Sequence, residues 1–172
     1  MSEEIYSVAL YGEITAESFR AALGHFCSGV SVVSAMTSHG PVGFTCQAFS
    51  SLSLKPPQVI VCPSRSSTTW PMVSAVGRFC VNVLAEDQAG LSEGFAHSGG
   101  DKFSSVEWTH TPSGSPMLRG AAAWIDCAVH ASYDGGDHLI VRGDVRWLDV
   151  APGSRPLLYH RGHYARIADH VP

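Results

Sequence analysis

The most informative stretch of this sequence runs Pro41-Val42-Gly43-Phe44-Thr45-Cys46-Gln47-Ala48-Phe49-Ser50-Ser51-Leu52-Ser53-Leu54-Lys55-Pro56-Pro57. Its centre is rich in hydroxyl-bearing and small side chains. The two prolines end it, because proline fixes φ and removes a backbone donor. The composition predicts one extended segment over residues 42–53. Since small side chains leave backbone N–H and C=O groups accessible, we expect this segment to lie against a flat ligand.

Further strands are predicted on both sides of this stretch, where β-branched residues are bounded by small or turn-forming residues. They span residues 29–34, 58–62, 78–84, 121–133 and 138–150, with a short one at 157–159. Asp134-Gly135-Gly136-Asp137 has the composition of a hairpin turn between the last two long strands. This spacing favours an antiparallel barrel over a doubly wound parallel sheet.

Short helices are predicted between some of the strands. Thr15 has the character of a helix cap, and apolar residues follow it at helical spacing up to Phe26. Two more helices are expected at 67–76 and 88–97, whereas 98–116 reads as a long irregular excursion rich in Gly, Ser, Thr and Pro. No internal repeat or linker is visible, so residues 1–172 are predicted to form a single, mainly β domain of the α+β type.

Composition narrows the class of protein. Of the 172 residues 45% are hydrophobic and 15% charged, which is typical of a folded domain. The low charged fraction indicates that a second copy of the chain covers part of the surface. The net charge of -4 argues against nucleic acid as a partner. No apolar run approaches the roughly 20 residues that span a bilayer, and the N-terminus is acidic, so we expect a cytoplasmic protein without a membrane partner.

Several common catalytic motifs are missing from the sequence. No Gly-x-Gly-x-x-Gly follows a strand, and neither a phosphate loop nor a Gly-x-Ser-x-Gly elbow occurs. His160 and His163 lack an obvious third ligand, so no metal site is predicted. Cys46 is either a nucleophile or a packed cysteine, and its phenylalanine neighbours favour packing, as expected for all five cysteines.

Two further blocks contain residues that could bind a ligand. Cys62-Pro63-Ser64-Arg65-Ser66-Ser67-Thr68-Thr69-Trp70 gathers hydroxyls where a strand gives way to a helix. It is either an ordinary helix cap or an anion site, with Arg65 or Lys102 adding positive charge. Gly135-Gly136-Asp137-His138 is either a plain hairpin turn or a turn that holds His138 against the edge of a ligand.

These blocks occur in order with Phe19-Arg20, Ser28-Gly29-Val30-Ser31-Val32-Val33 and Phe79-Cys80-Val81-Asn82-Val83-Leu84. Together they resemble the short-chain flavin reductases that serve two-component flavin-dependent monooxygenases. The resemblance covers about residues 19–164 and implies an antiparallel FMN-binding split β-barrel that forms a homodimer. It further implies reduction of FAD or FMN by NADH, with NADPH as the alternative, and transfer of the reduced flavin to a separate monooxygenase.

The resemblance also implies roles for particular residues. The flavin ring and ribityl chain would lie along Val42, Gly43, Phe44, Thr45, Gln47 and Ala48. The phosphate would lie near Cys62, Pro63, Ser64, Ser67, Thr68 and Thr69, with Phe95 and Lys102 close by. The nicotinamide would face His138, Arg161 and Tyr164, with His138 as the catalytic residue.

The sequence departs from the common family pattern at two places. Thr45-Cys46-Gln47-Ala48 stands where the family commonly has Thr-Ala-Asn-Ser, so one side-chain hydroxyl is lost at Ala48. Lys55 replaces a common Asp. The alternatives to a reductase are a non-catalytic flavin-binding sensor or carrier on the same barrel, and an enzyme like pyridoxamine-phosphate oxidase. The latter lacks a visible basic cluster for its second phosphate.

Overall fold

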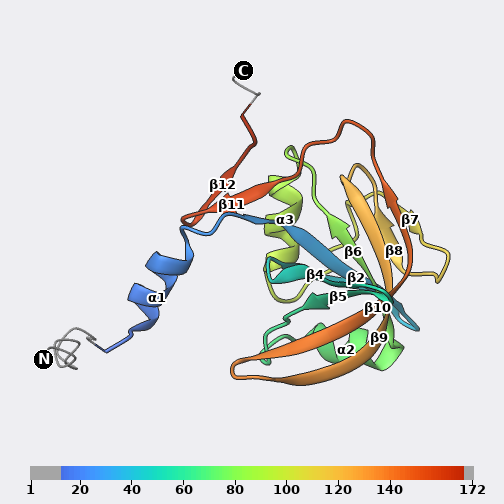
Figure 1. The fold of residues 1–172 in the computed structure, drawn as a ribbon. Coiled ribbons are helices and arrows are strands. Elements are labelled where there is room, and N and C mark those ends of the chain that lie inside the picture. Colours follow the sequence, from blue (N-terminus) through green and yellow to red (C-terminus); the bar gives the residue numbers. More distant parts are fainter. Residues whose placement is uncertain (1–12, 169–172) are drawn as a thin grey trace, which may run out of the picture.

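The computed structural model describes residues 13–168. Its main feature is a seven-stranded antiparallel sheet in the order β3-β2-β6-β9-β10-β5-β4, rolled into a barrel (Figure 1). The strands are β2 (Ser31–Thr37), β3 (Gly40–Cys46), β4 (Phe49–Leu54), β5 (Pro57–Val61), β6 (Arg78–Val83), β9 (Ala123–Gly135) and β10 (His138–Val150). The mainly β, antiparallel fold predicted from the sequence is confirmed.

The prediction of one extended segment over residues 42–53 is wrong. That stretch forms two strands, β3 and β4, which lie at opposite edges of the sheet. Only Gln47 and Ala48 separate them, and this link crosses between the two edges. The carbonyl of Ala48 accepts a hydrogen bond of 2.9 Å from the backbone N–H of Cys62, which ties the link to the end of β5.

Within the described residues, three helices accompany the sheet. Helix α1 (Ala16–Leu23) begins with the predicted Thr15 cap, in which the Thr15 and Ser18 side chains each bond the other residue's backbone. Helix α3 (Ala89–Ala96) lies within the predicted range. Helix α2 (Trp70–Val76) starts three residues later than predicted, because residues 67–69 form a turn in which Ser67 Oγ accepts from Trp70 N–H.

The remaining strands are short. β1 (Ser28–Gly29), β11 (Leu158–His160) and β12 (His163–Ala165) form a small separate sheet near α1. β7 (Trp108–His110) and β8 (Pro116–Leu118) form a hairpin that includes part of the excursion predicted to be irregular. The predicted turn between β9 and β10 is present, and Gly136 adopts the positive φ of 80° that it requires.

The interior divides into two apolar clusters. One fills the barrel, where Trp70 and Val73 of α2 pack on Val33, Phe79 and Val141. The other lies outside β2, where α3 and the segment after it cover Val30 and Val32 with Phe95, Phe103 and Leu118. Because β2 is covered on both faces, its first five residues are all buried.

The cysteines divide in a way that the sequence did not predict. All five are unpaired; Cys46, Cys80 and Cys127 are buried as predicted, but Cys62 is only partly covered and Cys27 is exposed. Burial raises the pKa of the Cys46 thiol to about 11, which keeps it protonated and supports packing over nucleophilic chemistry.

Within residues 13–168 no helix has the length and apolar character needed to cross a bilayer.

Candidate functional site

A cavity of about 370 Å³ opens where the end of β3, the Gln47–Ala48 link, the turn before α2 and the end of α3 meet. The start of β10 completes its wall with His138. Residues 44–48 line one side. The cavity therefore brings together three sequence blocks that lie far apart in the chain.

The β3 side of this cavity is fastened to α3. Thr45 Oγ1 donates a hydrogen bond of 2.6 Å to the carbonyl of Ser92. Gly43 allows the close approach, since a Cβ there would lie 2.9 Å from the ring of Phe95. Lys102 Nζ donates to the carbonyls of Phe95, at 3.0 Å, and Gly43, at 3.3 Å. These contacts fix a cation at the rim of the cavity.

The opposite side is a hydroxyl-rich loop. Ser64 Oγ and Ser66 Oγ lie 2.8 Å apart, and Ser64 Oγ also accepts from the backbone N–H of Ser66. Ser67 Oγ accepts from Trp70 N–H, and the backbone N–H groups of Ser66 and Ser67 bond Ser64, so it is the hydroxyl-bearing residues of this loop that line the cavity. This loop and Lys102 suit the phosphate of a nucleotide.

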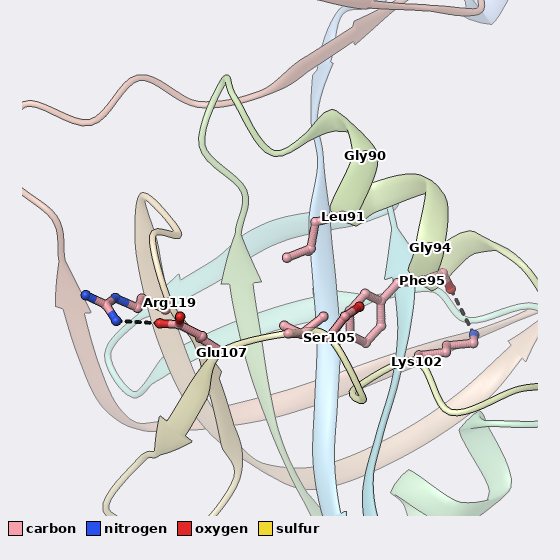
Figure 2. A pocket seen from close by; sticks show the side chains of 9 residues that line it. Gly90, Leu91, Gly94, Phe95, Lys102, Ser105, Glu107 and Arg119 are labelled. Atoms are coloured by element: carbon pink, nitrogen blue, oxygen red, sulfur yellow. Dashed lines mark hydrogen bonds and ion pairs between the residues drawn. The ribbon is translucent and has the colours of Figure 1, made fainter.

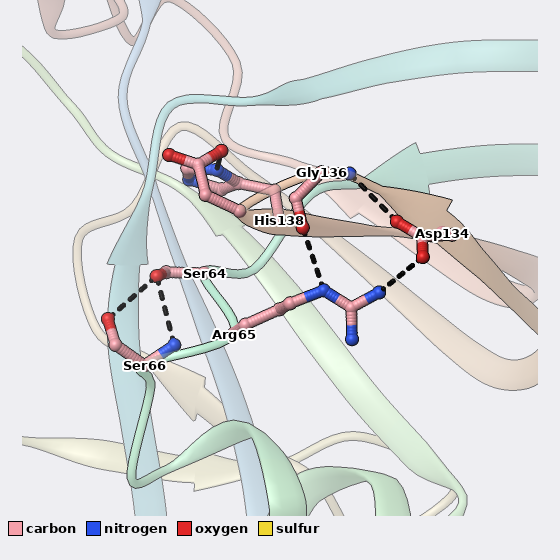
Figure 3. Close-up of polar contacts among 7 residues, drawn as sticks. Ser64, Arg65, Ser66, Asp134, Gly136 and His138 are labelled. Carbon is pink, nitrogen blue, oxygen red and sulfur yellow. Dashed lines mark hydrogen bonds and ion pairs between the residues drawn. The ribbon is translucent and has the colours of Figure 1, made fainter.

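Arg65 does not point into the cavity as a free positive charge; it holds the hairpin that carries His138 (Figure 3). Its Nε donates 2.8 Å to the carbonyl of Gly136, and its Nη2 lies 3.0 Å from the carboxylate of Asp134. The backbone N–H of Arg65 donates to the carbonyl of Asp137. The turn is thereby fixed to the hydroxyl-rich loop by three contacts from one residue.

His138 is oriented by its neighbour. Its Nδ1 lies 2.8 Å from Asp137 Oδ1. The hydrogen bond from His138 lowers the pKa of the Asp137 carboxyl, so this group is ionised near neutral pH and Nδ1 is the donor. Nε2 remains available to a ligand in the cavity that His138 lines.

Most residues implied by the family resemblance gather around this cavity. They are Phe44, Thr45, Gln47, Ala48, Cys62, Pro63, Ser64, Ser67, Thr68, Thr69, Phe95, Lys102 and His138. The sequence did not single out Cys46, Ser66, Ala96, His97 and Ser98 as ligand-binding residues, although they also line it. The last three lie at the end of α3 or directly after it, and nothing in the sequence distinguishes them from the residues of an ordinary helix end.

The other four residues implied by the resemblance do not line this cavity. Val42 packs against the barrel interior, and Gly43 contributes through its carbonyl behind the cavity wall. Arg161 lines a neighbouring cavity of about 730 Å³ beside α1, which shares Gln47, Ala48 and Cys62 with the first. Tyr164 lines a smaller one of about 290 Å³, where its hydroxyl donates 3.0 Å to Ser92 Oγ.

The electrostatics of the cavity suit an anionic ligand. Its lining includes Lys102 and two histidines but no carboxylate. Partial burial lowers the pKa of the Lys102 ammonium. Across residues 13–168 no three His, Cys, Asp or Glu side chains are grouped so that they could hold a metal ion. The fold and site together define a β-barrel with a cavity suited to a flat cofactor that carries a phosphate.

Comparison with known proteins gives the family. Residues 23–168 match the flavin reductase like domain, and the chain belongs to this family. It is 45% identical over 157 residues to the reductase subunit HsaB of a flavin-dependent monooxygenase from Mycobacterium tuberculosis, covering 90% of this chain and 84% of HsaB. It is 44% identical over 151 residues to a flavin reductase from Pseudomonas putida, covering 87% of this chain and 89% of that protein.

Solved structures agree with the fold. Nitrilotriacetate monooxygenase component B from Mycobacterium thermoresistibile superposes with a TM-score of 0.87 at 44% identity, covering 91% of this chain and 89% of that one. The NADH:FAD oxidoreductase SgcE6 of Streptomyces globisporus, in complex with NAD and FAD fragments, gives a TM-score of 0.87 at 32% identity, covering 94% of this chain and all of that one. The resemblance to flavin reductases drawn from the sequence is confirmed.

Proposed function

We propose that this protein is an NADH:flavin oxidoreductase that supplies reduced FAD or FMN to a separate flavin-dependent monooxygenase. The observation that carries the proposal is the cavity between Phe44–Ala48 and Cys62–Thr69. It pairs the end of the edge strand β3 with a hydroxyl-rich loop and a lining free of carboxylates, as a flavin nucleotide requires. The names of the relatives point to the same activity.

The residues of the chain would bind and orient rather than react. A bound flavin supplies the hydride-accepting chemistry, so the protein needs no nucleophile, and the raised pKa of Cys46 agrees with this. The backbone of residues 44–48 would hold the ring, while Ser64, Ser66 and Lys102 would hold the phosphate. His138 Nε2 would bind the second nucleotide and keep the two cofactors close together.

The direct test is the loss of NADH absorbance by the purified protein with added FAD, FMN or riboflavin, repeated with NADPH. We expect flavin-dependent NADH oxidation at a kcat of about 1 s⁻¹ or more, within the usual range for enzymes. Flavin binding without NADH oxidation would instead identify a flavin-binding sensor or carrier. If no flavin bound at all, the proposed function would be wrong.

We propose further that the protein acts as a homodimer in which a second copy covers α1 and the adjoining barrel face. Helix α1 stands apart from the barrel (Figure 1) and buries none of its residues. Phe19, Leu23 and Phe26 are 54–79% exposed around the 730 Å³ cavity. A large exposed apolar surface of this kind marks a protein interface.

The dimer has a simple test. Light scattering during size-exclusion chromatography is expected to give about twice the chain mass of 18.3 kDa. Changing Phe26 to Glu places a charge on this surface and should shift the mass toward one chain, whereas changing the exposed Ser104 to Glu should not. A monomer for the unaltered protein would overturn this proposal without affecting the assignment as a reductase.

A further inference from the structure

A second cavity, of about 470 Å³, lies on the other side of Phe95 and Lys102 from the first. Helix α3 forms one wall and the segment 102–107 forms the other (Figure 2). Leu91, Phe95 and Val106 give it an apolar floor. Figure 2 shows Lys102 at one end and the Glu107–Arg119 ion pair at the other.

Lys102 belongs to both cavities. Its ammonium group donates only to the carbonyls of Phe95 and Gly43, and no acidic side chain among residues 13–168 pairs with it. A partly desolvated cation whose partners are neutral is a favourable position for phosphate oxygens. An anion bound at Lys102 would therefore have one cavity on each side of it.

The wall formed by α3 is open at two glycines spaced one helical turn apart. Gly90 and Gly94 both line the second cavity, and a Cβ atom at either position would meet nothing within 4 Å. The helix thus presents bare backbone over an apolar floor, which leaves room for a flat ring. At the far end, the Glu107 carboxylate can accept hydrogen bonds and the Arg119 guanidinium can donate them or stack.

We propose that this second cavity binds the adenosine half of FAD. The isoalloxazine ring would occupy the first cavity, the phosphates would lie at Lys102, and the adenine would enter the space between α3 and Val106. The inference rests on the proposed function as a flavin reductase. It adds that FAD is bound more tightly than FMN, because only FAD reaches both cavities.

Filling the second cavity tests this inference. Gly94→Leu places a side chain in the open space over the cavity floor. We expect the KM for FAD to rise at least about tenfold, a loss of roughly 1.4 kcal/mol of binding free energy. The KM values for FMN, riboflavin and NADH should change less than about twofold, since these ligands would not use the cavity. Quenching of flavin fluorescence on binding, titrated without NADH, should show the same selective loss for FAD.

A matched control uses the same helix. Glu93→Leu introduces an identical side chain at an exposed position of α3 that lines none of the cavities described, and should leave FAD and FMN binding unchanged. Arg119→Ala, at the far end of the cavity, provides a second variant in case Gly94→Leu does not fold, and should also weaken FAD selectively.

Three results would overturn the inference. Equal binding of FAD by the unaltered protein and both cavity variants would show that the adenosine half lies elsewhere. Equal weakening of FAD and FMN would indicate a general distortion of the first cavity. A selective rise in the KM for NADH would assign the cavity to the nicotinamide dinucleotide. None of these resembles failure of the proposed function, in which no flavin would support NADH oxidation by the unaltered protein.

Discussion

Replacing His138 with alanine is expected to lower kcat/KM for NADH by about 30-fold while changing flavin affinity less than about twofold. Loss of a hydrogen bond to a charged or strongly polarised partner costs about 1.5–3 kcal/mol, and a 30-fold change, about 2 kcal/mol, lies within that range. His138 lines the cavity at the start of β10, and Asp137 holds its Nδ1 so that Nε2 is the atom left for the ligand. Steady-state kinetics with NADH as the varied substrate measures the change.

Two comparisons separate this role from a structural one. Asp137→Asn keeps a side chain that can accept from Nδ1, so kcat/KM for NADH should fall only about threefold. Arg65→Ala removes the contacts to Gly136 and Asp134 but leaves the imidazole in place, so it should raise KM for NADH more than it lowers kcat. Unchanged NADH oxidation by the alanine variant of His138 would exclude it from the reaction.

Changing Asn82 to alanine is expected to lower the free energy of unfolding by about 3 kcal/mol. The Asn82 amide is fully buried and donates to the carbonyl of Val32 at 3.0 Å and to Ser34 Oγ at 2.9 Å. Its oxygen accepts from the backbone N–H of Leu118 at 2.8 Å. Alanine leaves that N–H without its partner in an apolar environment and opens a small void, and each effect costs about 1–3 kcal/mol.

Thermal unfolding followed by circular dichroism measures this effect, and a midpoint lower by about 10 °C is expected. Ser34→Ala removes one of the same bonds and also loses the 2.6 Å bond to the carbonyl of Pro116, so the double variant should be less destabilised than the sum of the two. Ser50→Ala, on the exposed part of β4, serves as the neutral comparison. A midpoint within about 2 °C of the unaltered protein would show that the network is unimportant.

The local features of the fold could be predicted because their causes lie within a few residues. The Thr15 cap and the Gly136 turn each follow from short-range hydrogen bonding and backbone preference. The division of residues 42–53 into two strands could not be predicted, since Gln47 and Ala48 are not turn-forming residues. Their bend is imposed by the sheet edges that they connect, and by the bond from Cys62.

The candidate site shows the same division. Its hydroxyl-rich and histidine-bearing blocks stand out in the sequence because their composition is unusual for buried strands and helix starts. The direction of Arg65 could not be predicted, because its partners Asp134 and Gly136 lie about 70 residues away along the chain. Similarly, the hydrogen bond from Tyr164 to Ser92 of α3 joins residues far apart in the chain and could not be predicted.

The two-residue link between β3 and β4 limits how the length of the chain at this site can vary during evolution. Ligand sites usually sit on loops, which tolerate insertions and deletions. Here Gln47 and Ala48 border two cavities and also set the path from one edge of the sheet to the other. Adding or removing one residue would turn every side chain of β4 to the opposite face. This wall of the site can therefore change by substitution but not by a change in length.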